Sequence, residues 1–243
     1  MFEHFIECDV RRDRTILSVT EESVYNKLSC MLPQNIISDS TILDLGCATA
    51  AAGHWCISNN CRSYTGVEIQ NDYVKTAKQL LPNSEIIHSD IIDFLQGTDR
   101  KWEVVIAAGI LHGVFNPFKV IELMDKVATN YIIIENNETY ENWTPTIHFR
   151  KTNMINAGDL GNPHHGFATY VGSRAMQFIM NEYGWVGKRV YPQKLSSGID
   201  PYHDAIKFDD KLKEHVHRYV YIFSRAKTKK QSLEYLVKEN VGI

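Results

Sequence analysis

The sequence predicts an α/β fold in which helices cover both faces of a doubly wound, mostly parallel sheet. Residues 41–45 and 130–135 are short, continuous apolar runs of the kind that strands buried on both faces show. The first run ends at Gly46, and a cluster of small residues leads from it to Gly53. We therefore expect a strand, a tight turn and a helix over residues 41–59, with the other strands extending the sheet from this unit.

A helix is expected before this unit. Residues 18–21 match a capping box. The apolar residues Tyr25, Leu28 and Leu32 then recur at helical spacing, and Pro33 ends the pattern. This helix is expected to lie over the sheet.

The turn after the first strand carries an acid, Asp44, two residues before Gly46. At such a turn the backbone N–H groups and the positive end of the next helix face a ligand. A dinucleotide fingerprint requires no acid there, and a carboxylate repels phosphates. Asp44 therefore favours a ligand with a cationic amino group, and a nicotinamide dehydrogenase would need pyrophosphate-binding glycines that this sequence lacks.

The next two strands are each followed by an acid. Residues 63–68 are predicted as the second strand, ending at Glu68, and Asn71 is expected to cap the helix after it. Residues 84–88 are the third strand, followed by Asp90. An acid at the tip of the second strand can accept both hydroxyls of a ribose, at about 1.5 to 3 kcal/mol per hydrogen bond. NAD enzymes use the same position, and an acid that stabilises a helix N-terminus is the alternative.

The fourth strand is predicted at residues 101–108, and the fifth at 130–135. Between them, Asn116 and Pro117 fit a helix N-cap and a first-turn proline. Residues 136–172 have few periodic apolar positions, but their aromatic residues argue against disorder, so we expect a functional loop.

The last third of the chain completes the predicted sheet. Ser173 is expected to cap a helix that Gly184 ends. Strands six and seven are predicted at residues 185–191 and 217–225, with a loop insertion between them. A final helix is expected within residues 226–243, where it covers the sheet edge or a second subunit.

Composition limits the function. The 243 residues suit one domain with insertions, and the net charge of −3 gives no overall attraction to nucleic acid. No apolar run is long enough to cross a bilayer, and the start of the chain lacks the apolar core of a secretory signal, so a cytoplasmic protein is expected. The five cysteines lack the paired spacing of a zinc site and are expected to be free thiols.

The turn after the first strand also carries a family resemblance. Residues 44–50, Asp-Leu-Gly-Cys-Ala-Thr-Ala, resemble the D-x-G-x-G-x-G motif of class I (Rossmann-like) S-adenosylmethionine (SAM) dependent methyltransferases. Ala48 and Ala50 replace the second and third glycines. Their methyl groups are tolerated at negative φ and clash at positive φ, so either the loop is conventional or the pocket is remodelled. Small residues before a helix are also a common packing device.

The resemblance implies a seven-stranded sheet in the order 3-2-1-4-5-7-6 with strand seven antiparallel. It divides the chain into an N-terminal helical lid at 1–40, a SAM-binding domain at 41–225 and the C-terminal helix at 226–243. Substrate-lid insertions are expected near 136–172 and 192–217. For single lid residues such as Phe5, Arg11, Arg12, Arg14 and Tyr25, a solvated surface arm is the favoured alternative.

The resemblance also assigns cofactor contacts. Asp90 would accept the adenine amino group, and the Ile91 N–H would meet a ring nitrogen. Asp44, Glu68 and Asp90 at three successive strand ends form a pattern more specific than any one acid. The residues expected around SAM are Asp44, Gly46, Cys47, Ala48, Glu68, Ile69, Asp90, Ile91, Ala108 and Gly109.

Residues 109–117 are similar to the G-x-L-H-H-x-x-x-P stretch of small-molecule methyltransferases, with Gly113 in place of the second histidine. A base is needed only when the acceptor arrives protonated, and His112 has the best position for it. Glu135 and His165 follow as candidates, with His148 and His164 beside them. Motifs of adenine, glutamine and cytosine methyltransferases are absent.

We therefore expect methyl transfer from SAM to a small-molecule acceptor, at oxygen or nitrogen, by a monomer or homodimer without a metal. The histidines and the acid of the predicted lids lack characteristic ligand spacing; these are His148, His164, His165, His203 and Asp204. Two alternatives stay open besides the nicotinamide dehydrogenase. A tRNA or RNA methyltransferase could use the basic clusters at 11–14 and 227–230, and a non-catalytic SAM-binding interaction protein is compatible with the alanine-substituted motif.

Overall fold

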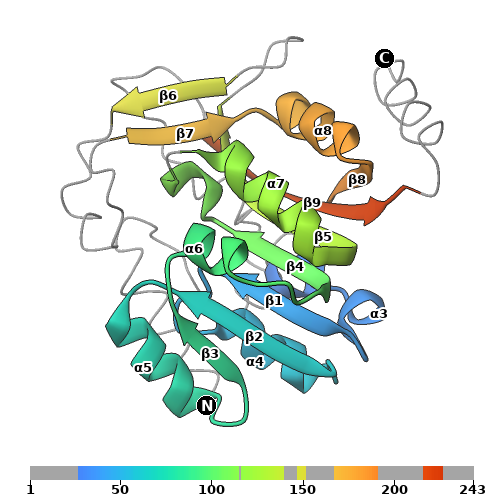
Figure 1. The fold of residues 1–243 in the computed structure, drawn as a ribbon. Coiled ribbons are helices and arrows are strands. Elements are labelled where there is room, and N and C mark those ends of the chain that lie inside the picture. The colour runs from blue at the N-terminus through green and yellow to red at the C-terminus, as the bar shows by residue number, and fades with distance from the viewer. Residues whose placement is uncertain (1–26, 115, 140–146, 152–166, 191–215, 227–243) are drawn as a thin grey trace, which may run out of the picture.

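The structure is built on a seven-stranded sheet (Figure 1). It is a computed structural model that describes residues 27–114, 116–139, 147–151, 167–190 and 216–226. The strands of the sheet are β1 (Thr41–Leu45), β2 (Ser63–Glu68), β3 (Glu85–His88), β4 (Trp102–Ala108), β5 (Ala128–Thr139), β8 (Trp185–Val190) and β9 (Val216–Arg225). They lie in the order β3-β2-β1-β4-β5-β9-β8, and β9 is antiparallel to β5 and β8. The predicted fold class, strand order and antiparallel last strand are confirmed.

Helices cover both faces of this sheet (Figure 1). The helical elements are α3 (Gln34–Ile37), α4 (Ala51–Ser58), α5 (Asn71–Leu80), α6 (Ile91–Gln96), the 3-10 turn η1 (Leu111–Gly113), α7 (Pro117–Val127) and α8 (Ser173–Glu182). Residues 27–31 are also helical. Apolar residues of α6, α7 and α8 form one core cluster against the sheet. On the other face, a second core cluster contains apolar residues of α4, of α5 and of the segments before β1.

Helix α7 follows the sequence prediction closely. The Asn116 side chain accepts the Lys119 N–H, and Pro117 occupies the first turn. Proline suits that position because the first N–H groups of a helix have no intrahelical partner. The helix then buries Val120, Met124 and Val127, which its periodicity predicts.

Two predicted helix caps are wrong. Helix α5 starts at Asn71, and its N-cap is Gln70. Helix α8 starts at Ser173, and its N-cap is Gly172. In both cases the helix begins one residue earlier than the side-chain signal indicates, and neither N-cap makes a side-chain capping bond. The end of α8 is as expected, since Gly184 follows it in the left-handed conformation at φ 79°.

The stretch 136–172 is not simply a long loop. Strand β5 continues to Thr139 because its extension pairs with β9. Two further strands, β6 (Ile147–Lys151) and β7 (Phe167–Val171), pair antiparallel in a separate two-stranded sheet. The predicted lid at 192–217, the capping box at 18–21 and the C-terminal helix lie wholly or almost wholly outside the described residues.

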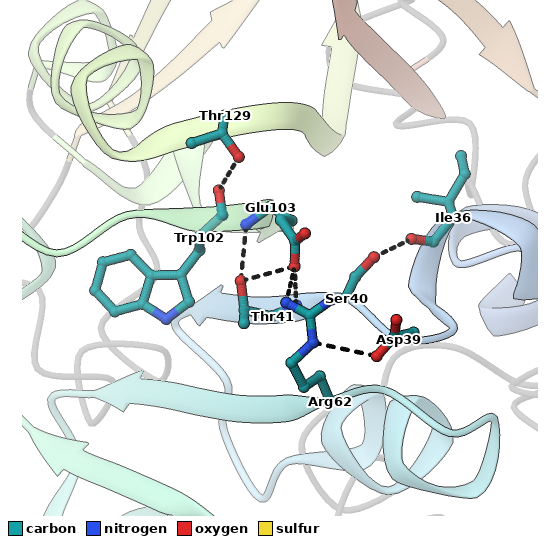
Figure 2. A network of polar contacts seen from close by, with 8 residues as sticks. All are labelled: Ile36, Asp39, Ser40, Thr41, Arg62, Trp102, Glu103 and Thr129. Carbon is teal, nitrogen blue, oxygen red and sulfur yellow. Dashed lines mark hydrogen bonds and ion pairs between the residues drawn. The ribbon is translucent and has the colours of Figure 1, made fainter.

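A polar network joins the amino-terminal ends of the central strands (Figure 2). The Thr41 N–H donates to Glu103 Oε2 at 2.8 Å, and the Glu103 N–H donates to Thr41 Oγ1 at 3.0 Å. The Arg62 guanidinium bonds Glu103 at 3.2 Å and Asp39 at 3.1 Å. The network ties β1, β4 and the residue before β2 together at this edge of the sheet.

Within the part of the chain that the structure describes, no helix is long and apolar enough to cross a membrane.

Candidate functional site

Three carboxylates are buried at the carboxyl edge of the parallel strands. Asp44 near the end of β1, Glu68 at the end of β2 and Glu135 on β5 have exposed fractions of 3%, 5% and 2%. Strands β2, β1, β4 and β5 are parallel neighbours, so these ends meet at one edge. Alternate residues of a strand share a face, which places all three acids on the face that α4 and α5 cover. Buried carboxylates are costly unless they have partners, so the partners define the site.

The turn after β1 holds its backbone in the left-handed region. Gly46 has φ 69°, and a Cβ there would lie 2.5 Å from Ile110 Cγ2. Ala48 and Ala50 have φ values of 49° and 66°. The sequence left open either a conventional loop, with negative φ at both alanines, or a remodelled pocket. These positive φ values show that the conventional loop is wrong. Each alanine costs about 1 to 2 kcal/mol in this conformation, so contacts of the loop must offset the strain.

Glu68 supplies one of those contacts. Its carboxylate accepts the Ala48 N–H at 2.9 Å and the Gln70 N–H at 2.8 Å. The N–H groups of Gly46 and Cys47 donate to Val67 O at 2.8 and 3.1 Å. The loop is therefore tied to the end of β2. A carboxylate has about four lone-pair sites, so two backbone donors leave Glu68 able to accept two more.

Asp44 is paired with a tyrosine that the sequence analysis did not single out. The Tyr64 hydroxyl donates to Asp44 Oδ2 at 2.7 Å. The Tyr64 ring packs on α4 at Gly53, where a Cβ would lie 2.6 Å from the ring carbons. Burial raises the pKa of Asp44 to about 7; the Tyr64 bond opposes the rise, the charge of Glu68 adds to it, and the charge of Lys27 opposes it. A cationic ligand group beside Asp44 would favour its ionised form.

The ends of β2 and β3 combine an apolar surface with polar groups. Ile69 is 36% exposed, and its carbonyl oxygen lies 2.8 Å from His88 Nε2. Asp90 caps α6, because its Oδ1 accepts the N–H groups of Ile92 and Asp93 at 2.7 and 3.3 Å. Ile91 begins this helix. The cap uses one carboxylate oxygen of Asp90, so the second oxygen remains for a ligand donor.

Glu135 is paired with a lysine that the sequence analysis also missed. Lys27 Nζ lies 2.9 Å from Glu135 Oε2. The end of β4 lies beside this pair, since the Gly109 N–H donates to Glu135 O at 2.9 Å. Gly109 has φ 66°, and a Cβ on it would come within 3.9 Å of Glu135 Oε2. A lysine next to the apolar stripe of a helix has no motif, so only the helical pattern around Leu28 could have drawn attention to it.

His112 lies on η1, directly after β4. Its ring is half-buried, and Leu111 beside it is fully buried in the core. Turn η1 packs against β7. Asn136, fully buried after Glu135 on β5, donates from Nδ2 to Val171 O of β7 at 3.4 Å. His112 thus follows the end of β4, and Glu135 lies on the neighbouring strand β5, where it pairs with Ala108 at that end.

The remaining predicted site residues are placed as follows. Cys47 is buried in the turn, where burial raises the pKa of its thiol, and Ala108 is the last residue of β4. Cys30, Cys47, Cys56 and Cys61 are free thiols, as expected. His148 lies on β6, whereas His164, His165, His203 and Asp204 lie outside the described residues. Among the residues that are described, no three His, Cys, Asp or Glu side chains gather in a way that could hold a metal ion.

Known proteins share this architecture. The family model of a methyltransferase domain matches residues 36–162. No curated protein matches the chain. The SAM-dependent methyltransferase from Mesorhizobium loti is 12% identical at a TM-score of 0.60, over 84% of this chain and 98% of its own.

Two further solved structures have a named chemistry. The magnesium protoporphyrin IX methyltransferase of Synechocystis with bound SAM is 10% identical at a TM-score of 0.54, over 91% of this chain and 84% of its own. The N-methyltransferase NodS of Bradyrhizobium japonicum, in complex with S-adenosylhomocysteine (SAH), is 14% identical at a TM-score of 0.53, over 83% of this chain and 86% of its own. At these identities the likeness is one of fold.

The strained loop gives a testable expectation. Ala48→Gly and Ala50→Gly should each raise the free energy of unfolding by about 0.5 to 1 kcal/mol, because relief of the left-handed strain exceeds the added chain entropy of glycine. Urea unfolding measures the change. Ala77→Gly in helix α5 is the matched control and should lower stability by about 1 kcal/mol or more. A loss of stability at both loop positions, equal to that of the control, would contradict the strain.

Proposed function

This chain belongs to the methyltransferase domain family, whose class I members depend on SAM, and from that premise we propose that it methylates a small-molecule acceptor at nitrogen or oxygen. The observation that carries the proposal is the group of three buried acids beside the left-handed turn. SAM supplies a methyl group on a sulfonium that is already activated for displacement. The acids and the turn are suited to holding such a cationic ligand.

We assign the described residues to parts of the cofactor. Asp44 would bind the amino group, since a cation favours its ionised form. Glu68 would accept the ribose hydroxyls with the acceptor capacity that its two backbone bonds leave. The remaining predicted residues would line the two ends of the cofactor. Asp90, Ile91 and Ile69 would lie at adenine, and the methionine part would be lined by Gly46, Cys47, Ala48, Ala108 and Gly109.

The acceptor would approach from the ends of β4 and β5. The main task of the protein is to hold the acceptor atom in line with the methyl group at about 3 to 3.5 Å. His112 would take the proton of an acceptor that arrives as a hydroxyl or an ammonium. Glu135, whose carboxylate lies over the end of β4, would accept a hydrogen bond from the same acceptor. His165 stays a further candidate from the sequence.

Small molecules are favoured over RNA on two grounds. The net charge of −3 offers no general attraction to a phosphate backbone. Two of the structural neighbours are named as an N-methyltransferase and a magnesium protoporphyrin IX methyltransferase, which supports a small acceptor. The second candidate function is a SAM-binding protein without turnover, and the strain at Ala48 and Ala50 is the observation that favours it.

The proposal is tested by transfer of a labelled methyl group from SAM to panels of amines, hydroxyl compounds and tRNA. Label on a small molecule is expected. With that acceptor, His112→Ala should lower turnover about 100-fold or more, because a positioned base contributes that much, and SAH affinity should stay within about twofold. Label on tRNA alone would contradict the small-molecule acceptor. SAH binding without any transfer would favour the non-catalytic candidate, and an unchanged rate would remove His112 from the mechanism.

The pKa of Asp44 predicts how cofactor binding depends on pH. Below pH 7 the buried carboxyl must lose a proton before it can pair with the ammonium of SAH, so affinity should rise by up to about tenfold per pH unit as the pH approaches 7 from below, and level off above about pH 7. Tyr64→Phe removes a hydrogen bond to the carboxylate and should move the midpoint upward.

Calorimetric titration with SAH across this range measures the effect. The control ligand is 5′-methylthioadenosine, which lacks the ammonium and should bind with a flat pH profile. The same pH profile for both ligands would show that Asp44 does not bind the amino group of SAH.

A further inference from the structure

We propose that His88 is a positioning residue for the cofactor, because its ring holds Ile69 in place as the apolar surface that adenine contacts. The inference rests on the proposed function, since it deepens the assignment of the adenine end of the same site. His88 is the last residue of β3, and its Nε2 lies 2.8 Å from Ile69 O, just beyond the end of β2.

The peptide group between Ile69 and Gln70 is held at both of its polar atoms. Its carbonyl oxygen, Ile69 O, is bound by the His88 ring, and its N–H, that of Gln70, donates to Glu68 Oε1 at 2.8 Å. A peptide group is planar, so bonds at its two ends fix the orientation of the whole group. Strand β2 fixes the chain before Ile69, and this peptide group fixes the chain after it. The direction of the Ile69 side chain is set between them.

The two side chains that hold this peptide group come from neighbouring strands. Glu68 and His88 are register partners in the parallel pair of β2 and β3. The Ser89 N–H also donates to Glu68 O at 3.0 Å, which ties the chain after β3 to the end of β2. Both supports of Ile69 therefore start from the sheet, which positions side chains more accurately than a loop does.

The chemistry of the bond assigns the role to an N–H group. A carbonyl oxygen only accepts, so Nε2 of His88 carries a proton and donates it to Ile69 O. The neutral Nε2–H tautomer and the imidazolium both have this proton, so the bond does not depend on the charge of the ring. An uncharged side chain with an N–H at a similar reach can replace it, and glutamine is such a side chain.

Ile69 is suited to contact a flat apolar ligand. It is 36% exposed, whereas Val67 and Glu68 before it are 0% and 5% exposed. Burial of an exposed apolar side chain against a ligand favours binding. Because the neighbouring peptide group is already held, less ordering is needed when adenine arrives, and more of that gain appears as affinity.

A purely structural role for His88 is the alternative, since Gln70 is the N-cap of α5. In that role, loss of the bond would act on ligand binding independently of the Ile69 side chain. The two roles therefore differ in whether His88 and Ile69 act together or separately on the affinity for the cofactor.

The experiment is a double-mutant cycle, measured by calorimetric titration with SAH. His88→Ala should weaken SAH binding about fivefold, the effect of about one hydrogen bond, and Ile69→Ala should weaken it about tenfold. The double variant should bind SAH within about twofold of Ile69→Ala, because His88 acts through a side chain that is then absent. A loss of about 50-fold, the product of the two single effects, would overturn the positioning role.

Two further variants test the N–H group and the helix. His88→Gln keeps a donor and should bind SAH within about twofold of the wild-type protein. Thr76→Ala is the matched control, since it removes another exposed side-chain bond to the backbone, from Thr76 Oγ1 to Asp72 O on α5, and it should keep full affinity. If His88→Gln or Thr76→Ala weakens SAH binding as much as His88→Ala does, the proposal is overturned.

The wild-type protein separates this proposal from the proposed function. If it does not bind SAH, the proposed function itself fails. If it binds SAH and His88→Ala, shown by urea unfolding to be folded, binds equally well, only the role of His88 fails.

Discussion

Burial of three carboxylates at one edge of the sheet is the constraint on which the rest of the site depends. Each acid has a partner from a different part of the chain: the hydroxyl of Tyr64 for Asp44, two backbone N–H groups for Glu68, and Lys27 for Glu135. Local features follow from these pairs. Gly53 is needed where the Tyr64 ring packs on α4, and the helical segment at 27–31 must lie on the sheet to bring Lys27 to β5.

The turn after β1 shows how strain and function meet at this edge. Alanines in the left-handed region are unfavourable, and they persist where surrounding contacts over-determine the backbone. The bond from the Ala48 N–H to Glu68 is such a contact. Glu68 therefore holds the turn in this shape, and its carboxylate keeps acceptor capacity beyond these two backbone bonds.

The sequence anticipated what local pattern determines. The strand at β1 was predicted from a short apolar run, and the start of α7 from Asn116 and Pro117. The strand order came from the family resemblance. Pairings between residues distant in the sequence could not be predicted. Tyr64 contacts Asp44 only because β1 and β2 lie side by side, and Lys27 contacts Glu135 only through helix packing. Helix α6 and strands β6 and β7 were missed because segments this short carry little periodicity.

The central claim is that this edge of the sheet holds SAM. Its most direct test is calorimetric titration of the wild-type protein and of Glu68→Ala with SAH, with NAD as the control ligand. The account predicts micromolar binding of SAH to the wild-type protein, about −8 kcal/mol, weaker binding to the variant, and no binding of NAD. Binding of NAD, or equal binding of SAH by both proteins, would contradict it.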